Sequence, residues 1–181
     1  MTVIGITGYA QHGKDSLGDM FAEIGFRKMA FADALRRCVA TLDPVVGQYG
    51  ERYSEVLAKV GYEEAKKLPE VRRLLQVMGT EVVRDILGED SWVRALEKEW
   101  TEAGMESIVI TDVRFPNEAE WVHRQGGTLI RVIRPLFENG VSREHPSELH
   151  IESLQDDVGV VATNLDELRE CFQYLRQRES V

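Results

Sequence analysis

The chain has 181 residues, which suits one folded domain, and 29% of them are charged, with a formal net charge of -9. This negative charge argues against a broad electrostatic grip on nucleic acid or on an anionic membrane, and no apolar run is long enough for a membrane-spanning helix. The two cysteines, Cys38 and Cys171, have no metal-binding spacing. They favour free thiols in a reducing compartment, so we expect a cytoplasmic protein without nucleic-acid or membrane partners.

Short apolar runs alternate with amphipathic segments along the chain, and this alternation predicts the elements of the fold. In chain order we expect a strand over 2–7, a helix over 14–24, a strand over 27–31, a helix over 34–42, a strand over 107–111, a helix over 116–124, strands over 128–133 and 158–162, and a helix over 166–176. Asp33 is placed to cap the second helix, and Asn164 or Thr163 the last. The pattern predicts a three-layer α/β fold, in which a parallel five-stranded sheet carries helices on both faces and binds ligand at the carboxyl ends of its strands.

Two segments interrupt this alternation. Residues 51–101 are charged and mostly helical, with breaks near Gly61, Pro69 and Gly88, and are the best candidate for an insert. Residues 135–150 are polar and predict a loop or short helical flap. The expected organisation is a single domain over 1–181, with a core made of 1–35, 104–134 and 156–181, a helical region over about 36–103 and a flap over about 135–155.

The segment from Gly8 to Ser16 matches the phosphate-loop pattern G-x-x-x-x-G-K. Two glycines let the backbone curl so that successive N–H groups point at phosphate oxygens, and the following helix adds its positive end. A strand ends just before the loop and a helix begins just after it, which distinguishes the pattern from a chance match. The residues expected to bind a nucleoside triphosphate are Gly8, Ala10, Gln11, His12, Gly13, Lys14, Asp15 and Ser16.

A carboxylate replaces the usual hydroxyl of this loop, because Asp15 follows Lys14 and Ser16 comes one place later. The magnesium contact then comes from Asp15, from Ser16 or through water, and Asp15 equally suits the positive start of a helix. A second carboxylate, Asp112, ends the apolar strand over 107–111, which is the pattern of a Walker B element. The alternative is that Asp112 caps the next turn or pairs with Arg114. The loop upstream favours the metal role.

A helix over 71–87, taken at 100° per residue, separates an apolar face from a polar one. The expected core face is Val71, Leu74, Leu75, Met78, Val82 and Ile86, and the polar face is Arg73, Gln76, Thr80 and Arg84. The polar face carries no carboxylate and suits an anionic acceptor with a base to be recognised, although a solvated surface gives the same pattern. Arg36 and Arg37 are further candidates for binding an acceptor phosphate.

Several polar residues lie in or beside the flap: Arg131, Arg134, Arg143, His145 and Glu148. A flap that carries arginine supplies positive charge over a transferring phosphoryl group and excludes water. We expect Arg131 to pack along its strand and His145 to be an ordinary loop residue. Arg134 and Arg143 are both placed to meet the transferring group, and the sequence does not choose between them.

Several blocks of sequence together resemble the phage deoxynucleoside monophosphate kinases, which belong to the nucleoside monophosphate kinase-like P-loop family. They are Gly13-Lys14-Asp15-Ser16, Phe31 to Arg36, Leu74 to Glu81, Arg84, Asp90 to Val93, Asp112 to Glu118, and His145 to Glu148. These blocks are spread over nearly the whole chain and are more specific together than the phosphate loop alone.

The resemblance implies transfer of the γ-phosphoryl group of ATP to a deoxynucleoside monophosphate, with Mg2+, for DNA precursor supply, in the host cytoplasm if the protein is phage-encoded. It implies that the helical region binds the acceptor and that the flap is a lid, and it is compatible with a homodimer. The implied catalytic residues are Lys14, Asp112, Arg134 and Arg143, with metal ligands among Asp15, Ser16 and Asp112. The implied substrate-binding residues are Asp33, Arg36, Arg37, Arg73, Gln76, Arg84, Trp92, Arg114 and Glu148.

Two other functions share parts of this pattern. A different small-molecule kinase, such as a dephospho-coenzyme A kinase, has the same core. A guanine-specific switch protein is expected to carry Asn-Lys-x-Asp, which the sequence lacks, since Asn164-Leu165-Asp166 has no lysine. We rank the switch last.

Overall fold

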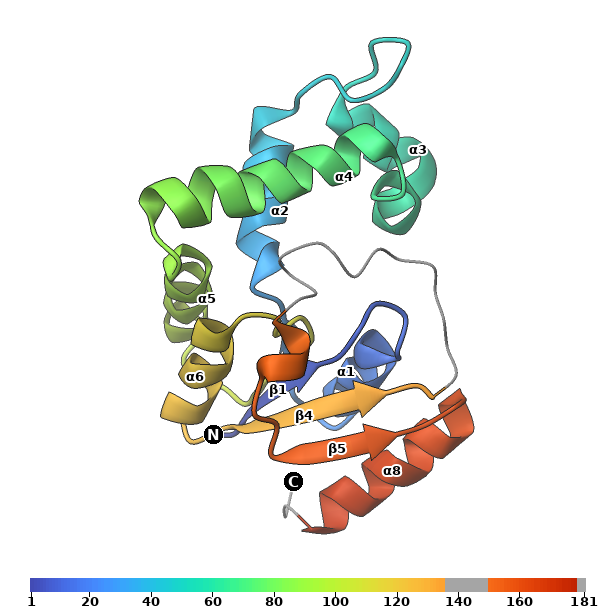
Figure 1. Ribbon diagram of the computed structural model, residues 1–181, viewed down its shortest axis with the longest axis vertical. Helices are drawn as coiled ribbons and strands as arrows, with labels where there is room; N and C mark the ends of the chain where they lie inside the picture. Colours follow the sequence, from blue (N-terminus) through green and yellow to red (C-terminus); the bar gives the residue numbers. More distant parts are fainter. Residues whose placement is uncertain (136–149, 179–181) are drawn as a thin grey trace. The chain divides into compact units, whose positions relative to one another are not determined.

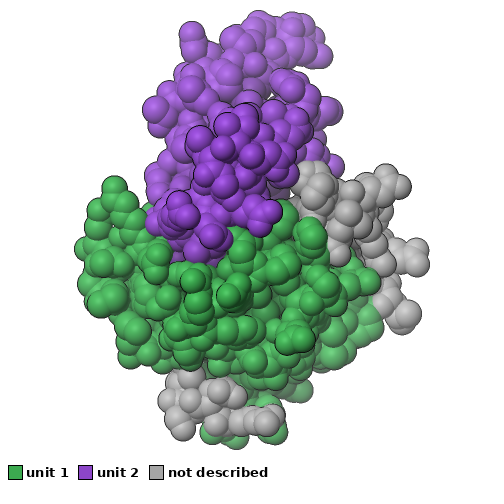
Figure 2. Space-filling model, turned by 60° about the vertical axis from the view of Figure 1, so that its left-hand side comes forward, with its two compact units in different colours: residues 1–30, 97–181 green, residues 31–96 purple. Residues whose placement is uncertain are grey.

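The computed structural model describes residues 1–135 and 150–178. The chain divides into two compact units, which Figure 2 colours green and purple: unit 1 comprises 1–30 and 97–181, and unit 2 comprises 31–96. Within the described residues no helix is long and apolar enough to cross a membrane.

Unit 1 is built on a parallel sheet whose strand order is β2-β3-β1-β4-β5, of which Figure 1 labels β1, β4 and β5. The strands are β1 (Val3–Thr7), β2 (Arg27–Met29), β3 (Ile108–Ile110), β4 (Thr128–Ile133) and β5 (Val158–Val161). All five residues of the central strand β1 are buried, as expected for a strand covered on both faces. The predicted five-stranded parallel sheet is therefore confirmed.

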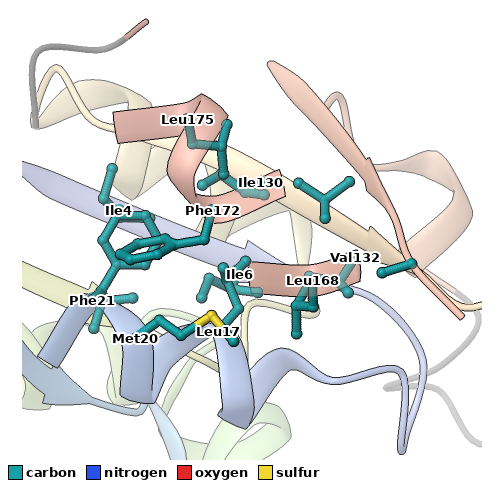
Figure 3. Close-up of a cluster of buried hydrophobic side chains, with 13 residues drawn as sticks. Ile4, Ile6, Leu17, Met20, Phe21, Ile130, Val132, Leu168, Phe172 and Leu175 are labelled. Atoms are coloured by element: carbon teal, nitrogen blue, oxygen red, sulfur yellow. The ribbon is translucent and has the colours of Figure 1, made fainter. Parts of the chain in front are cut away.

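Helices cover both faces of this sheet. Side chains alternate along β1, so Ile4 and Ile6 point to one face, where they pack in one apolar cluster with α1 (Lys14–Glu23) and α8 (Leu165–Arg178). Figure 3 shows this cluster, in which the rings of Phe21 and Phe172 pack edge to face with their centres 5.0 Å apart. The other face, at Gly5, lies against Val122 of α6 (Pro116–Arg124). The result is the predicted three-layer arrangement.

The last helix begins where the sequence predicts. The Oδ1 atom of Asn164 accepts hydrogen bonds from the backbone N–H groups of Asp166 and Glu167, both at 3.0 Å. Glu167 in turn accepts one from the backbone N–H of Thr163 at 2.8 Å. These bonds satisfy N–H groups that a helix start leaves without partners, so Asn164 is the cap of α8.

Unit 2 is helical: α2 (Ala32–Leu42), α3 (Tyr53–Ala65), α4 (Pro69–Gln76), η1 (Val77–Leu87) and the first half of α5 (Ser91–Glu102). Its core is the cluster of Val39, Val46, Tyr53, Val56, Ala65 and Val71. The expected breaks at Gly61, Pro69 and Gly88 are confirmed, since α3 kinks at Gly61, α4 starts at Pro69 and η1 ends before Gly88. Asp33 does not cap α2, because the helix already begins at Ala32. Asp33 lies in its first turn and pairs with Arg36 at 2.7 Å.

The second half of the predicted helix over 71–87 is wound differently from expectation. Residues 77–87 form a π-helix, whose hydrogen bonds reach five residues along the chain, so that each residue advances by less than 100°. Val82 and Ile86, expected in the core, are 37% and 73% exposed, whereas Val83 and Arg84 are 8% and 7% exposed. The assignment of Val82 and Ile86 to the core is therefore wrong, because the pattern assumed a regular α-helix.

Helix α1 packs closely on the end of β3 through Gly18. A Cβ atom built on Gly18 would lie 2.3 Å from the Cγ2 atom of Thr111, well inside van der Waals contact. The residue must therefore be glycine for the helix to sit where it does.

Replacing Gly18 by alanine is expected to lower the free energy of unfolding by about 1–3 kcal/mol, because the helix has to shift off the sheet. Gly159→Ala is the matched control, since a Cβ atom there meets nothing within 4 Å. Urea unfolding followed by circular dichroism measures both. Equal urea midpoints for Gly18→Ala and Gly159→Ala would contradict the close packing of α1 on the end of β3 at Gly18.

Candidate nucleotide-binding site

The loop between β1 and α1 reverses sharply over the carboxyl end of the sheet. Gly8 has a φ of 136°, and a Cβ atom on it would lie 2.4 Å from the carbonyl oxygen of Val132 in β4. Gly13 has a φ of 100° and directly precedes the first turn of α1. Both conformations favour glycine, so the two glycines of the motif stand where the backbone requires them. The loop N–H groups and the helix start form a site suited to an anion.

Lys14 is the cation of this loop, and it is only 7% exposed. Its Nζ atom donates a hydrogen bond to the carbonyl oxygen of Tyr9 at 2.7 Å, so the side chain folds back across its own loop. A buried ammonium group is costly unless it is paired or hydrogen-bonded. An anionic ligand in the loop would offer Lys14 a stronger, charged acceptor than the Tyr9 carbonyl.

Neighbouring elements hold the loop in place. The hydroxyl of Tyr9 donates to Glu152 at 2.6 Å, in the short 3-10 helix η2 (Ile151–Ser153). The backbone N–H of Arg134 donates to Nδ1 of His12 at 3.2 Å. Because Nδ1 accepts this bond, a neutral His12 ring carries its proton on Nε2. The loop is thus anchored to the end of β4 and to η2.

Asp112 lies at the same edge of the sheet. Strands β1 and β3 are parallel neighbours in which Gly5 is opposite Ile110, so the residues after Ile110 run beside the end of β1. The backbone N–H of Thr111 donates to the Met29 carbonyl at 3.2 Å, and the backbone N–H of Val113 donates to the Ile6 carbonyl at 3.1 Å. These bonds fix the backbone on both sides of Asp112. Asp112 therefore follows a strand that lies directly beside the strand leading into the loop.

A different carboxylate caps the helix that follows. Glu118, 3% exposed, accepts hydrogen bonds from the backbone N–H groups of Arg114 and Phe115 at 2.8 and 3.1 Å. These bonds satisfy N–H groups at the start of α6. Glu118 thus caps the start of α6.

The arginines around the flap have distinct positions. The guanidinium of Arg131 bonds to the Asp156 carboxylate at 2.5 Å and to the carbonyls of Ile151 and Leu154 at 2.7 and 2.6 Å. It therefore packs along the sheet and ties η2 to β4, as expected. The Nε atom of Arg134 donates to the Thr163 carbonyl at 3.1 Å. Arg143, His145 and Glu148 lie outside the described residues.

Substituting Arg131 by methionine is expected to cost about 1–3 kcal/mol of stability, since it leaves Asp156 and two carbonyls without their donor in a mostly buried place. Arg169→Met, which removes an exposed ion pair with Asp166, is the control and should cost less than about 0.5 kcal/mol. Thermal unfolding separates the two. A similar, small loss for both variants would show that Arg131 does not hold η2.

In unit 2 the predicted acceptor arginines and Gln76 differ in exposure and in their partners. Arg36 is held, since it pairs with Asp33 and its guanidinium carbon lies 4.8 Å from the centre of the Tyr62 ring. Arg73 is on the surface and pairs with Glu70 at 2.6 Å, one turn earlier, so a carboxylate does lie beside the polar face. That hydrogen bond from Arg73 lowers the pKa of Glu70. The remaining members are Arg37, which is exposed, Gln76, which is half-buried, and Arg84, which is buried.

Trp92 has a structural contact in this unit. Its indole N–H donates to the carbonyl oxygen of Gly79 at 2.9 Å, and the side chain is 8% exposed. An indole has a single donor, so this donor is already engaged in holding η1. A direct hydrogen bond from Trp92 to substrate is not part of this arrangement.

Sequence patterns missed three residues around the loop. Tyr9 and Glu152 pair across 143 positions of sequence, which leaves no local signal. Lys28 contacts Asp15 at 3.4 Å and Asp19 at 2.8 Å. The spacing of the two aspartates, four apart on one helix face, is the one signal that could have pointed to a shared cation.

Residues 51–171 match the family model described as deoxynucleotide monophosphate kinase. The chain belongs to this family. It is 28% identical, over 91% of its length and 89% of the relative, to a protein of Acanthamoeba polyphaga mimivirus. It is 34% identical to the deoxynucleoside-5'-monophosphate kinase of Escherichia phage T5 over 82 residues, which are 42% of this chain and 33% of that relative. The family resemblance expected from the sequence is confirmed, and the chain is a phosphotransferase of the nucleotide kinase type.

Among solved structures, dephospho-CoA kinase from Campylobacter jejuni is similar, with a TM-score of 0.52 over 98% of this chain and 97% of that one. The two sequences are 14% identical, so the likeness concerns the fold alone. It confirms the P-loop kinase architecture.

Proposed function

We propose that this protein transfers the γ-phosphoryl group of ATP to a deoxynucleoside monophosphate and releases ADP and the deoxynucleoside diphosphate. One observation carries the proposal: a nearly buried lysine, Lys14, stands in a glycine-bounded loop at the carboxyl end of β1, with Asp112 at the end of the adjacent strand. Family membership supplies the class of acceptor.

The donor is held by the loop from Gly8 to Ser16. The backbone N–H groups and the positive end of α1 bind the phosphate oxygens, and Lys14 exchanges the Tyr9 carbonyl for the β- and γ-phosphates. The hydrogen bonds to Tyr9 and His12 keep the loop in position before ATP arrives, which lowers the cost of ordering it.

Magnesium fits the residues present at this edge. It prefers hard oxygen ligands and is commonly held by one or two protein oxygens together with substrate phosphates. Asp112 would hold it on one side, and Asp15 or Ser16 on the other. When bound, the ion neutralises charge on the triphosphate.

The helical region, about 36–103, is proposed to bind the acceptor, and the segment over about 135–155 to act as the lid. Arg36, Arg37, Arg73 and Arg84 suit the acceptor phosphate, and Gln76 suits a base edge. Asp33, Trp92, Arg114 and Glu148 complete the proposed acceptor set.

An oxygen of the acceptor phosphate attacks the γ-phosphorus while the bond to the β-γ bridging oxygen breaks and ADP leaves. No general base is needed, because the attacking oxygen is already anionic. Arg134 or Arg143, with Arg114, offsets the charge that develops during transfer.

We also propose that the protein works in the cytoplasm, that of the host if it is phage-encoded, without nucleic-acid or membrane partners. The net charge of -9 and the two free cysteines support this setting. A homodimer is compatible with it, and sedimentation measures that state.

Substituting Lys14 by alanine should reduce turnover at least about 100-fold, because the cation that follows the transferring phosphoryl group is lost. Lys59→Ala, at an exposed lysine paired with Glu51, is the control and should keep its turnover. A coupled assay for ADP release measures both. Turnover near that of the wild type in Lys14→Ala would refute this role.

A panel of acceptors with ATP tests the reaction itself. We expect phosphorylation of one or more deoxynucleoside monophosphates, because the family and the loop together define a donor and an acceptor. The panel includes dephospho-coenzyme A, whose kinase shares the fold. Phosphorylation of dephospho-coenzyme A and of no deoxynucleoside monophosphate would overturn the proposed acceptor, and ATP hydrolysis without any acceptor would favour a switch.

A further inference from the structure

Lys28, on β2, lies across the first two turns of α1. Its Nζ atom is 2.8 Å from Oδ1 of Asp19, 3.4 Å from Oδ1 of Asp15 and 3.4 Å from the Asp15 carbonyl oxygen. The stem passes over Gly18, where a Cβ atom would lie 3.4 Å from Cε of Lys28. The stem therefore runs along the helix at Gly18 and carries the ammonium group to both carboxylates.

The two aspartates share this one ammonium group. They are four residues apart and therefore lie on the same face of the helix. Partial burial lowers the pKa of Lys28, but the hydrogen bond from Lys28 to Asp19 and the charges of Asp15 and Asp19 outweigh burial, and the pKa is raised overall. Lys28 accordingly remains charged at neutral pH beside the start of the phosphate loop helix.

Asp15 occupies a place where a negative charge opposes the ligand. It follows Lys14 directly, in the first turn of α1, where the N–H groups and the helix dipole favour anions. A free carboxylate there repels a triphosphate, and the nearby ammonium group of Lys28 offsets part of that repulsion.

We propose that Lys28 is a positioning residue of the nucleotide site. It holds the Asp15 carboxylate against the β2 side of α1 and offsets its charge, so that the helix start accepts an anionic triphosphate although an acid stands where a hydroxyl is usual. On this assignment Asp15 is a partner of Lys28 rather than a metal ligand, and Ser16 and Asp112 remain for the metal. The inference rests on the proposed binding of ATP by Gly8 to Ser16.

Equilibrium binding of a fluorescent ATP analogue, with ATP as the competitor, tests this assignment. The Kd of ATP is measured once in EDTA and once in Mg2+. In EDTA, Lys28→Met should raise the Kd about 3- to 10-fold, a modest effect because the Asp15 side chain is 78% exposed. The increase should shrink in high salt. The double variant Lys28→Met/Asp15→Asn should return the Kd to within about twofold of the wild type, because the charge that needed compensation is gone.

Asp19→Asn is the matched control. It removes the shorter contact of Lys28 but leaves the contact with Asp15, so the Kd should stay within about twofold of the wild type. Circular dichroism and thermal unfolding establish that each variant is folded. If Lys28→Met does not fold, Asp15→Asn decides, and it should bind ATP more tightly than the wild type in EDTA, because the repelling charge is removed.

Three results would overturn the assignment: an unchanged Kd in Lys28→Met, no recovery in the double variant, or weaker binding by Asp15→Asn in Mg2+ but not in EDTA. The last would identify Asp15 as a metal ligand. A folded wild-type protein that does not bind ATP at all would instead refute the proposed function, so the two failures are distinguishable.

Discussion

The close approach of the loop backbone to β4 at Gly8 is the constraint on which the site depends. The Val132 carbonyl occupies the space that any side chain at Gly8 would need. This contact brings the loop down onto the end of the sheet, where the backbone of Arg134 reaches His12 and Glu152 reaches Tyr9. Because β3 is the other neighbour of β1, Asp112 is delivered to the same edge. The close backbone approach of the loop to β4 thus fixes where the proposed site lies.

Much of unit 1 was predictable because its signals are local. A β-branched run, a glycine-bounded loop and a capping asparagine each depend on a few neighbouring residues, and β1, the phosphate loop and the start of α8 agree with prediction. The position of β3 beside β1 is not a local property, because the two strands lie far apart in the sequence. The contacts of Lys28 are different, since they join a strand to a helix face through space. Although Lys28 lies only 13 positions after Asp15, the periodicity of neither the strand nor the helix relates the two residues.

Unit 2 shows where periodicity fails. A helical wheel assigns faces correctly only while the turn stays at 100° per residue, and η1 departs from that value over Val77–Leu87. The departure buries Arg84 and exposes Ile86, so a cation is buried and an apolar side chain is exposed, the opposite of what the helical wheel assigned. It also coincides with Gly79, whose carbonyl accepts the Trp92 indole and whose bare backbone lies next to Leu35. The roles expected of Arg73, Gln76 and Arg84 remain predictions, because they concern a ligand.

The three bonds made by Arg131 have a consequence for the phosphate loop. They fasten residues 151–156 to β4. Within that segment η2 carries Glu152, which accepts the hydrogen bond of the Tyr9 hydroxyl. Part of the order of the phosphate loop therefore comes from an arginine on a neighbouring strand, through a short helix that lies far away in the sequence.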